Sequence, residues 1–249
     1  VEATTVNKMC GSGMQTAIMG AEALAAGSVD MIVTGGMESM TNAPYLLPKL
    51  RGGARIGHAG VIDSMFLDGL EDAYDTGRLM GTFAEDCAEA FQFTRDAQDE
   101  YALRSLTRAL EAEASGAVTA ELASVTMNTR KGAVTVDTDE QPANARPEKI
   151  PLLKPAFRDG GTVTAANSSS ISDGAAALLL AAQSTDLPVR AYIRGHASHA
   201  QDPAWFATAP VPATQKLLDR IGWAIEDVDL WEVNEAFAVV PMAFMQDLG

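Results

Sequence analysis

A cysteine near the start of the chain has the most reactive setting in the sequence. Cys10 lies in residues 6–14, Val-Asn-Lys-Met-Cys-Gly-Ser-Gly-Met, between a predicted strand at 1–9 and a predicted helix at 14–26. At such a junction the unpaired N–H groups of the helix N-terminus and the helix dipole favour thiolate over thiol. The neighbouring glycines let a bulky substrate approach the backbone closely. The pattern predicts a nucleophile that accepts an acyl group.

The alternative for any single cysteine is a structural role, because free cysteines are among the most buried residues. Composition alone does not exclude this for Cys10; the strand-to-helix junction is what favours a function. Cys87, the other cysteine of the chain, lies beside apolar residues such as Phe83 and Ala88 on a predicted helix. We expect Cys87 to be a core residue.

A second candidate is Asn234, which opens the run Asn-Glu-Ala-Phe-Ala at 234–238. This run also lies at a predicted strand-to-helix junction. An amide side chain there can donate a hydrogen bond to a bound carbonyl oxygen or order a water molecule. Taken alone the signal is weak, because an Asn at a helix start is most often an N-cap.

The elements around these residues predict an α/β protein. The strand at 1–9, the helix at 14–26 and a strand at 31–34 read as a β-α-β unit, which implies a parallel sheet with a right-handed crossover. The middle of the chain reads as a mixed insertion. The further predicted elements are helices at 82–91, 94–116 and 212–221, a hairpin at 118–137, and strands at 160–167, 189–199 and 229–234.

Composition limits the partners. The chain has 249 residues and a net charge of −15, so we expect neither nucleic acid nor an anionic membrane surface as a partner. The sequence contains no run of 18 apolar residues, so no transmembrane helix is expected.

Two cysteines offer no disulfide framework, which favours a reducing, cytoplasmic compartment. The chain does not begin with Met, and we expect a segment to precede it.

Together, the Cys10 and Asn234 segments closely resemble the thiolase family of acyl-CoA C-acyltransferases. Further segments agree in order along the whole chain, namely Gly-Gly-Met-Glu-Ser-Met at 35–40, 80–85, 132–139, 155–157 with 161–164, and 166–176. The resemblance is greatest to the acetoacetyl-forming, biosynthetic type. It implies layered α/β/α thiolase halves with an inserted α+β loop domain, truncated at both ends. The implied domains are 1–40, the CoA-covering loop domain 41–171, and 172–249.

The resemblance also implies a role for each matching residue. Cys10 would be the acylated nucleophile, and its own N–H would form half of the oxyanion hole. Asn234 would hold the water that binds the thioester oxygen of the condensing acetyl group. The other candidates are Ser169 and Phe157 along the pantetheine arm of CoA, Met80 in the acyl pocket, and Arg146 for CoA binding, in a loop whose length differs from the family's.

The implied reaction is the condensation of two acetyl-CoA to acetoacetyl-CoA and CoA, or the reverse thiolysis. The resemblance implies no metal and no cofactor beyond CoA as substrate, and a homodimer or homotetramer. Alternatives are a 3-ketoacyl-CoA thiolase of fatty-acid degradation, a ketoacyl synthase, or a non-catalytic CoA-binding or assembly fragment. The Asn-Glu-Ala-Phe run argues against the synthase.

The chain departs from the family pattern. The family's Gly-His-Pro and Cys-x-Gly-Gly-Gly motifs do not occur, and none of the three histidines is followed by Pro. We therefore expect little activity from the chain by itself. Leu79 stands where many short-chain members have His, and Phe206 where Met often lines the pocket, so the acyl-chain preference stays open. The pair His196-x-x-His199 could suggest a metal, but we expect solvated or core histidines.

Overall fold

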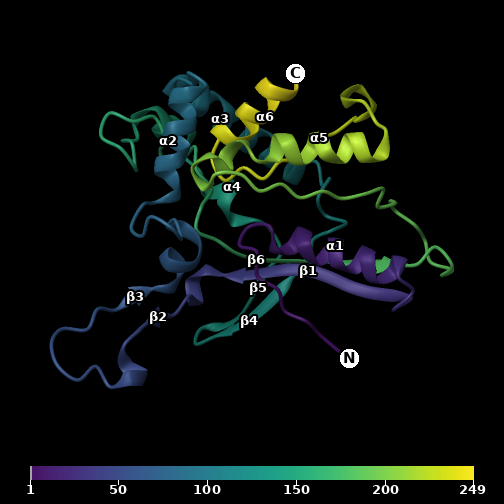
Figure 1. Cartoon of the computed structure of the whole chain (residues 1–249), viewed down its shortest axis with the longest axis horizontal. Coiled ribbons are helices and arrows are strands. Elements are labelled where there is room, and N and C mark those ends of the chain that lie inside the picture. Colours follow the sequence, from purple (N-terminus) through teal and green to yellow (C-terminus); the bar gives the residue numbers. More distant parts are fainter. Residues whose placement is uncertain (1) are drawn as a thin grey trace. The chain divides into compact units, whose positions relative to one another are not determined.

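The computed structural model describes residues 2–249, and Val1, the first residue of the predicted N-terminal strand, lies outside the described residues. The chain divides into two compact units. Figure 1 labels their helices and strands. Unit 1 comprises Val1–Phe83 and Ser170–Trp231, and unit 2 comprises Ala84–Ser169 and Glu232–Gly249. Each unit mixes helices and strands, in keeping with the predicted α/β class. The predicted domain limits at residues 40 and 171 stay a prediction.

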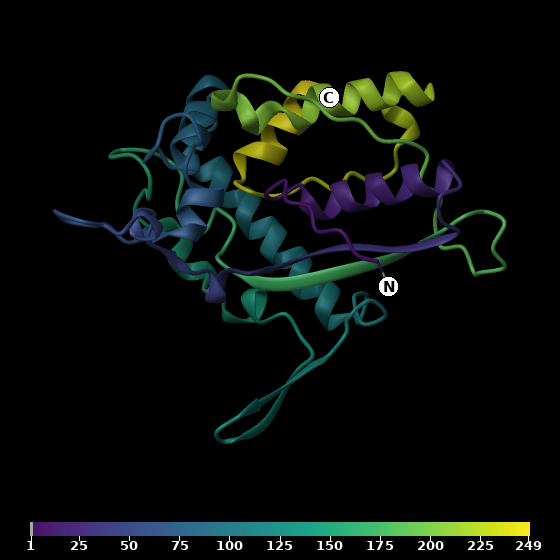
Figure 2. The same cartoon turned by 60° about the horizontal axis from the view of Figure 1, so that its bottom comes forward.

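Unit 1 is built on a two-stranded ribbon with a helix packed along it. Strand β1 (Met31–Ser39) pairs antiparallel with β6 (Asp173–Ala181). Helix α1 (Ser12–Ala25) lies against this ribbon, as Figure 2 shows. The Thr16 hydroxyl ties the helix to the strand, because it donates to the Gly35 carbonyl and accepts from the Gly35 N–H, both at 2.9 Å.

Glycine permits this close packing of helix on ribbon. A Cβ added to Gly20 of α1 would lie 2.6 Å from Cγ2 of Thr34 and 3.1 Å from Cδ1 of Leu180. Such distances are below ordinary contact, so any larger residue would push the helix away from the ribbon. Residue 20 is therefore glycine for reasons of packing rather than of backbone conformation.

The remainder of unit 1 consists of short elements, helix α5 and the start of helix α2. Helix α2 (Met80–Ala90) begins in unit 1, and the ring of Phe83 meets that of Phe206 edge-on at 6.3 Å. Gly222 ends helix α5 (Pro210–Ile221) in the left-handed conformation. The other elements are η1 (Met40–Asn42), β2 (Tyr45–Leu46) paired with β3 (Ile62–Asp63), η2 (Leu50–Gly52), the π-helical turn η3 (Phe66–Leu70), η5 (Pro203–Thr208) and η6 (Ile225–Asp227).

Unit 2 has its core between helices. Thr94 caps helix α3 (Arg95–Ala114) by accepting from the Ala97 N–H. Strands β4 (Val125–Thr129) and β5 (Gly132–Val136) form an exposed hairpin. Helix α4 (Glu140–Asn144), η4 (Pro147–Leu152) and helix α6 (Val239–Leu248) complete the unit. Its buried apolar residues are Ala84, Cys87, Ala88, Ile150, Val163, Phe237, Ala238, Val239, Val240, Ala243 and Phe244.

The structure confirms the helices predicted at 14–26, 82–91, 94–116 and 212–221 and the hairpin, each with small shifts of its bounds. The predicted parallel β-α-β unit is wrong. Residues 2–7 form no strand, and β1 pairs antiparallel with β6. A β-strand needs a neighbour for its backbone hydrogen bonds, and within residues 2–249 no segment pairs with 2–7.

The strands predicted at 160–167, 189–199 and 229–234 do not form either. At 160–167 side chains take the place of a strand partner, because the Thr162 and Val163 N–H groups donate to the Glu85 carboxylate. The other two segments have no paired neighbour within the described part of the chain. No helix formed by residues 2–249 combines the length and apolar character needed to span a bilayer.

We expect the substitution Gly20→Ala to destabilise unit 1. Alanine would favour helix by up to about 1 kcal/mol, but overpacking against the branched side chain of Thr34 costs about 1–3 kcal/mol. Gly60→Ala is the control, because a Cβ there meets nothing within 4 Å. Urea unfolding should show a lower midpoint for Gly20→Ala and an unchanged one for Gly60→Ala. A midpoint at or above that of the wild type for Gly20→Ala would contradict the packing argument.

Candidate active site

Cys10 lies on a tight turn directly before α1 in unit 1. It is exposed, and the residue before it, Met9, has a φ of +46°. A non-glycine residue in this left-handed region carries backbone strain, which proteins retain mainly where the surroundings enforce it. The chain thus turns sharply at the cysteine, as the predicted junction requires, although the segment before it is not a strand.

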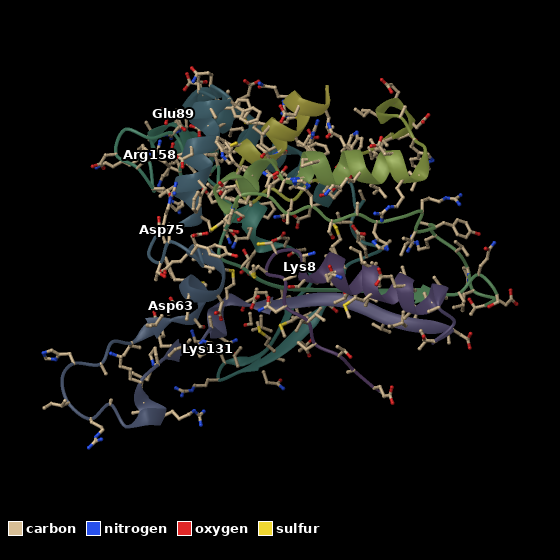
Figure 3. All side chains as sticks on the ribbon, in the orientation of Figure 1. Lys8, Asp63, Asp75, Glu89, Lys131 and Arg158 are labelled. Atoms are coloured by element: carbon tan, nitrogen blue, oxygen red, sulfur yellow. The ribbon has the colours of Figure 1, made fainter. Side chains whose placement is uncertain are left out.

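Short hydrogen bonds enforce this turn. The Lys8 N–H donates to the Ser12 hydroxyl at 2.7 Å, and that hydroxyl donates to the Met9 carbonyl at 2.7 Å. The Met9 N–H donates to the Asn7 side chain at 2.9 Å. Lys8, labelled in Figure 3, also donates from its ammonium group to Gln15 on α1 at 3.1 Å. Local side chains therefore hold the turn in place on the helix N-terminus.

Met80, the candidate for the acyl pocket, is the first residue of α2 and is half-buried. The neighbouring turn is fixed by Thr82, whose hydroxyl donates to the Leu79 carbonyl at 2.8 Å. The Arg78 guanidinium lies 3.8 Å from the centroid of the Phe83 ring, a cation–π arrangement. Cys10 and Met80 belong to unit 1, and the other four candidate residues belong to unit 2.

In unit 2 the segment that carries Asn234 is bound to residues 167–169. The Ser169 N–H and hydroxyl both donate to the Ala236 carbonyl, at 3.0 and 3.2 Å. The Ala238 N–H donates to the Asn167 carbonyl at 2.9 Å. Asn234 is exposed. The structure therefore brings the predicted residue Ser169 next to the backbone that presents Asn234.

Phe157 joins the same group. Its ring meets the buried Phe237 ring edge-on, with centroids 5.9 Å apart. The Ala156 N–H donates to the Val163 carbonyl at 2.9 Å, which holds the Phe157 loop on the neighbouring segment. Arg146 is exposed at the start of η4, and no hydrogen bond of this group involves it. Of the residues predicted for CoA, Phe157 and Ser169 converge and Arg146 does not.

A buried polar network under this group was not predicted from the sequence. The Glu85 side chain, in a residue only 3% exposed, accepts from the Thr162 N–H at 2.9 Å, the Thr162 hydroxyl at 3.1 Å and the Val163 N–H at 2.8 Å. Arg158 fixes the preceding loop to α2 through Asp86 and Glu89, the latter at 3.2 Å (Figure 3). The bonds to Glu85 satisfy the Thr162 and Val163 N–H groups, which a neighbouring strand would otherwise pair.

Asn167 is the second centre of the network. Its side-chain oxygen accepts from the Thr164 N–H at 2.7 Å, and its amide donates to the Asp99 carboxylate at 3.0 Å and to the Thr162 carbonyl at 3.2 Å. Asp99 is in turn paired with Arg95 at 2.7 Å. Asp99 lies between Gln98 and Glu100 in the sequence, so its neighbours give no signal that it is buried or that it pairs with Asn167.

The two cysteines differ as predicted in exposure. Cys87 is buried in unit 2, and burial raises the pKa of its thiol to about 11, with a further contribution from the Asp247 carboxylate. A buried thiol with a raised pKa is a poor nucleophile. The structure thus confirms Cys87 as a core residue and leaves Cys10 as the accessible thiol.

The histidine pair of unit 1 has neighbours of its own. His196 Nε2 lies 3.5 Å from the Glu22 carboxylate. His199 lies between the Lys216 ammonium, at 2.9 Å from Nδ1, and the Gln201 side chain, at 3.0 Å from Nε2. Both rings therefore have protein partners at the surface.

Comparison with known proteins agrees with the motifs. The family model described as thiolase, N-terminal domain, matches residues 1–184, and that of the thiolase C-terminal domain matches residues 187–249. The acetyl-CoA acetyltransferase of Pseudomonas aeruginosa is 45% identical over 100% of this chain and 65% of its own length, and that of Escherichia coli is 46% identical over 98% and 64%. The chain thus spans less than two thirds of these relatives.

Solved structures show the same fold. The acetyl-CoA acetyltransferase of Bacillus anthracis matches with a TM-score of 0.92 and 37% identity, over 98% of this chain and 62% of that one. The Acat5 thiolase from Ascaris suum, solved in complex with coenzyme A, matches with a TM-score of 0.90 and 38% identity, over 98% and 63%. With both family domains matched and the fold shared, the chain belongs to the thiolase family.

Proposed function

We propose that the whole protein is an acyl-CoA C-acyltransferase that condenses two acetyl-CoA to acetoacetyl-CoA and CoA, or catalyses the reverse thiolysis. The observation that carries the proposal is the exposed Cys10 on its strained turn at the start of α1. The names of the relatives, acetyl-CoA acetyltransferases, support the substrate.

The reaction proceeds in two half-reactions. The Cys10 thiolate attacks the thioester carbon of an acyl-CoA, the bond to the CoA sulfur breaks, and CoA leaves as a thiol after taking up a proton. A second acetyl-CoA then loses a proton from its α-carbon. The resulting carbanion attacks the acyl carbon on Cys10, and the cysteine leaves as a thiolate. Because negative charge develops on a thioester oxygen in each step, oriented hydrogen-bond donors supply most of the stabilisation.

The other candidate residues bind and orient the substrates. Asn234 orders the water that donates to the thioester oxygen of the second acetyl-CoA. Ser169 and Phe157, which lie beside the Asn234 segment, contact the pantetheine arm. Met80 lines the acyl pocket, and Arg146 supplies positive charge for CoA. We further propose a cytoplasmic homodimer or homotetramer acting in lipid metabolism.

The family's histidine and second-cysteine motifs do not occur in residues 1–249. In the proposed mechanism the histidine assists the nucleophilic cysteine, and the second cysteine moves the α-proton of acetyl-CoA. Residues 1–249 alone should therefore give little turnover. Turnover within about tenfold of a full-length thiolase, equivalent to about 1.4 kcal/mol of barrier, would contradict this part of the proposal.

We expect Cys10→Ala in the whole protein to lower kcat for acetoacetyl-CoA thiolysis by about 10⁶-fold, the effect of removing the nucleophile in a serine protease. Asn234→Ala should lower it by about 10²-fold, the usual effect of one oxyanion donor. Cys87→Ala is the matched control, since Cys87 is buried in the core. Loss of acetoacetyl-CoA absorbance follows the reaction. An active Cys10→Ala variant would exclude the proposed nucleophile.

Iodoacetamide should label Cys10 of the folded chain at least about tenfold faster than Cys87 near neutral pH, since thiolate is the reactive form. Burial keeps the Cys87 thiol protonated until the pH approaches about 11. Mass spectrometry of tryptic peptides gives the two rates, and labelling in denaturant, where both thiols are exposed, is the control. Preferential labelling of Cys87 in the folded chain would contradict the assignment.

A further inference from the structure

The carboxylate of Glu235, the residue after Asn234, is held by two hydroxyl groups of α3. Its Oε1 atom accepts from the Tyr101 hydroxyl at 2.7 Å, and its Oε2 atom accepts from the Ser105 hydroxyl at 2.7 Å. Residues 101 and 105 are four apart on one helix and so face the same side. Each carboxylate oxygen therefore has its own donor, on successive turns of α3.

This arrangement fixes the orientation of the carboxylate and not only its position. Hydrogen bonds to an ionised acceptor are short and stronger than neutral ones, and two of them at different oxygens resist rotation of the group. On the other side of the segment, Ala236 and Ala238 are bonded to Ser169 and Asn167. Before Asn234, residues 229–233 form no strand. Glu235 is thus the anchor adjacent to Asn234.

We propose that Glu235 is a positioning residue for acyl transfer: its attachment to Tyr101 and Ser105 fixes the peptide that carries Asn234 and hence the direction of the Asn234 amide. This inference rests on the proposed function. Glu235 touches neither substrate nor reacting atoms in this scheme. It acts by limiting the motion of the residue that orders the water.

The electrostatic setting keeps the proton on the tyrosine. Burial raises the pKa of Tyr101, the hydrogen bond to Glu235 and the charge of Glu235 raise it further, and the charges of Arg104 and Arg108 oppose the rise. The Arg104 guanidinium lies 5.2 Å from the centroid of the Tyr101 ring. The hydroxyl therefore stays a donor to the carboxylate through the pH range of the assay.

The first test compares Glu235→Gln, Tyr101→Phe and Ser105→Ala in the whole protein. Glu235→Gln keeps the size of the side chain, but its amide oxygen can accept a hydrogen bond and its NH₂ group cannot. Tyr101→Phe removes one of the two donor hydroxyls. Both should lower kcat for thiolysis by at least about tenfold, since small misplacements near the chemistry cost up to about a hundredfold. KM should change less than about twofold, because Ser169 and Phe157 keep their places. Ser105→Ala should have a smaller effect of the same kind.

The matched control is Glu111→Gln, which removes an exposed carboxylate from the same helix. Its kcat and KM should equal those of the wild type. A general loss of structure would lower the unfolding midpoint and change KM together with kcat. The three variants should instead lower kcat with KM nearly unchanged, even where the loss of a hydrogen bond lowers the unfolding midpoint.

The second test needs no turnover and uses the 249-residue chain. Hydrogen exchange followed by mass spectrometry should be faster at 234–238 in Glu235→Gln than in the wild type and Glu111→Gln.

The outcomes separate the two proposals. An inactive wild type would overturn the proposed function, while faster exchange at 234–238 would still support the positioning by Glu235. An active wild type whose Glu235→Gln variant keeps kcat within about twofold would overturn the positioning role alone. Unchanged exchange at 234–238 in Glu235→Gln would overturn it as well. If Glu235→Gln fails to fold, Tyr101→Phe and Ser105→Ala decide on the same readouts.

Discussion

Backbone N–H and C=O groups that lie outside regular structure must find other hydrogen-bond partners. This constraint shapes the Cys10 turn in unit 1 and the segment 162–164 in unit 2. At the Cys10 turn the side chains of Asn7 and Ser12 provide those partners. In unit 2, the carboxylate of Glu85 and the amide of Asn167 do so for residues 162–164. Each segment is therefore fixed in an irregular conformation by buried or local side chains.

A fixed irregular backbone is useful for the proposed chemistry. A side chain on a regular strand or helix points where the repeat directs it, whereas a turn held by its neighbours can present one residue outward. Cys10 follows a residue in the left-handed region, and Asn234 precedes a segment bonded to Ser169 and Asn167. In both cases hydrogen bonds next to the exposed side chain restrict the backbone, which would lower the cost of orienting that side chain for the proposed reaction.

The sequence predicted local features well. Helix α3, the β4–β5 hairpin and the core position of Cys87 all depend on residues within a few positions of one another, and the structure confirms them. Strand formation depends instead on a distant partner. Residues 160–167 have the β-branched composition of a strand, but Glu85 bonds the backbone of Thr162 and Val163 instead.

The same distinction applies to the site. The sequence predicts Cys10 and Asn234 as site residues from their neighbours, because a cysteine at a helix start and an amide at a junction leave a local pattern. Glu235 belongs to the same motif, but the sequence assigns it no role, since its partners Tyr101 and Ser105 lie 134 and 130 positions away. Nothing in the residues around Tyr101 indicates that Glu235 is its partner, so this contact can be seen only in the structure.

The central claim, that Cys10 carries the acyl group, is tested most directly by trapping the intermediate. The whole protein is incubated with acetyl-CoA, quenched in acid, digested and examined by mass spectrometry. The peptide that contains Cys10 should gain the mass of one acetyl group, and addition of CoA before the quench should remove it. An enzyme that turns over while Cys10 stays unmodified, or that carries the acetyl group on another residue, would contradict the claim.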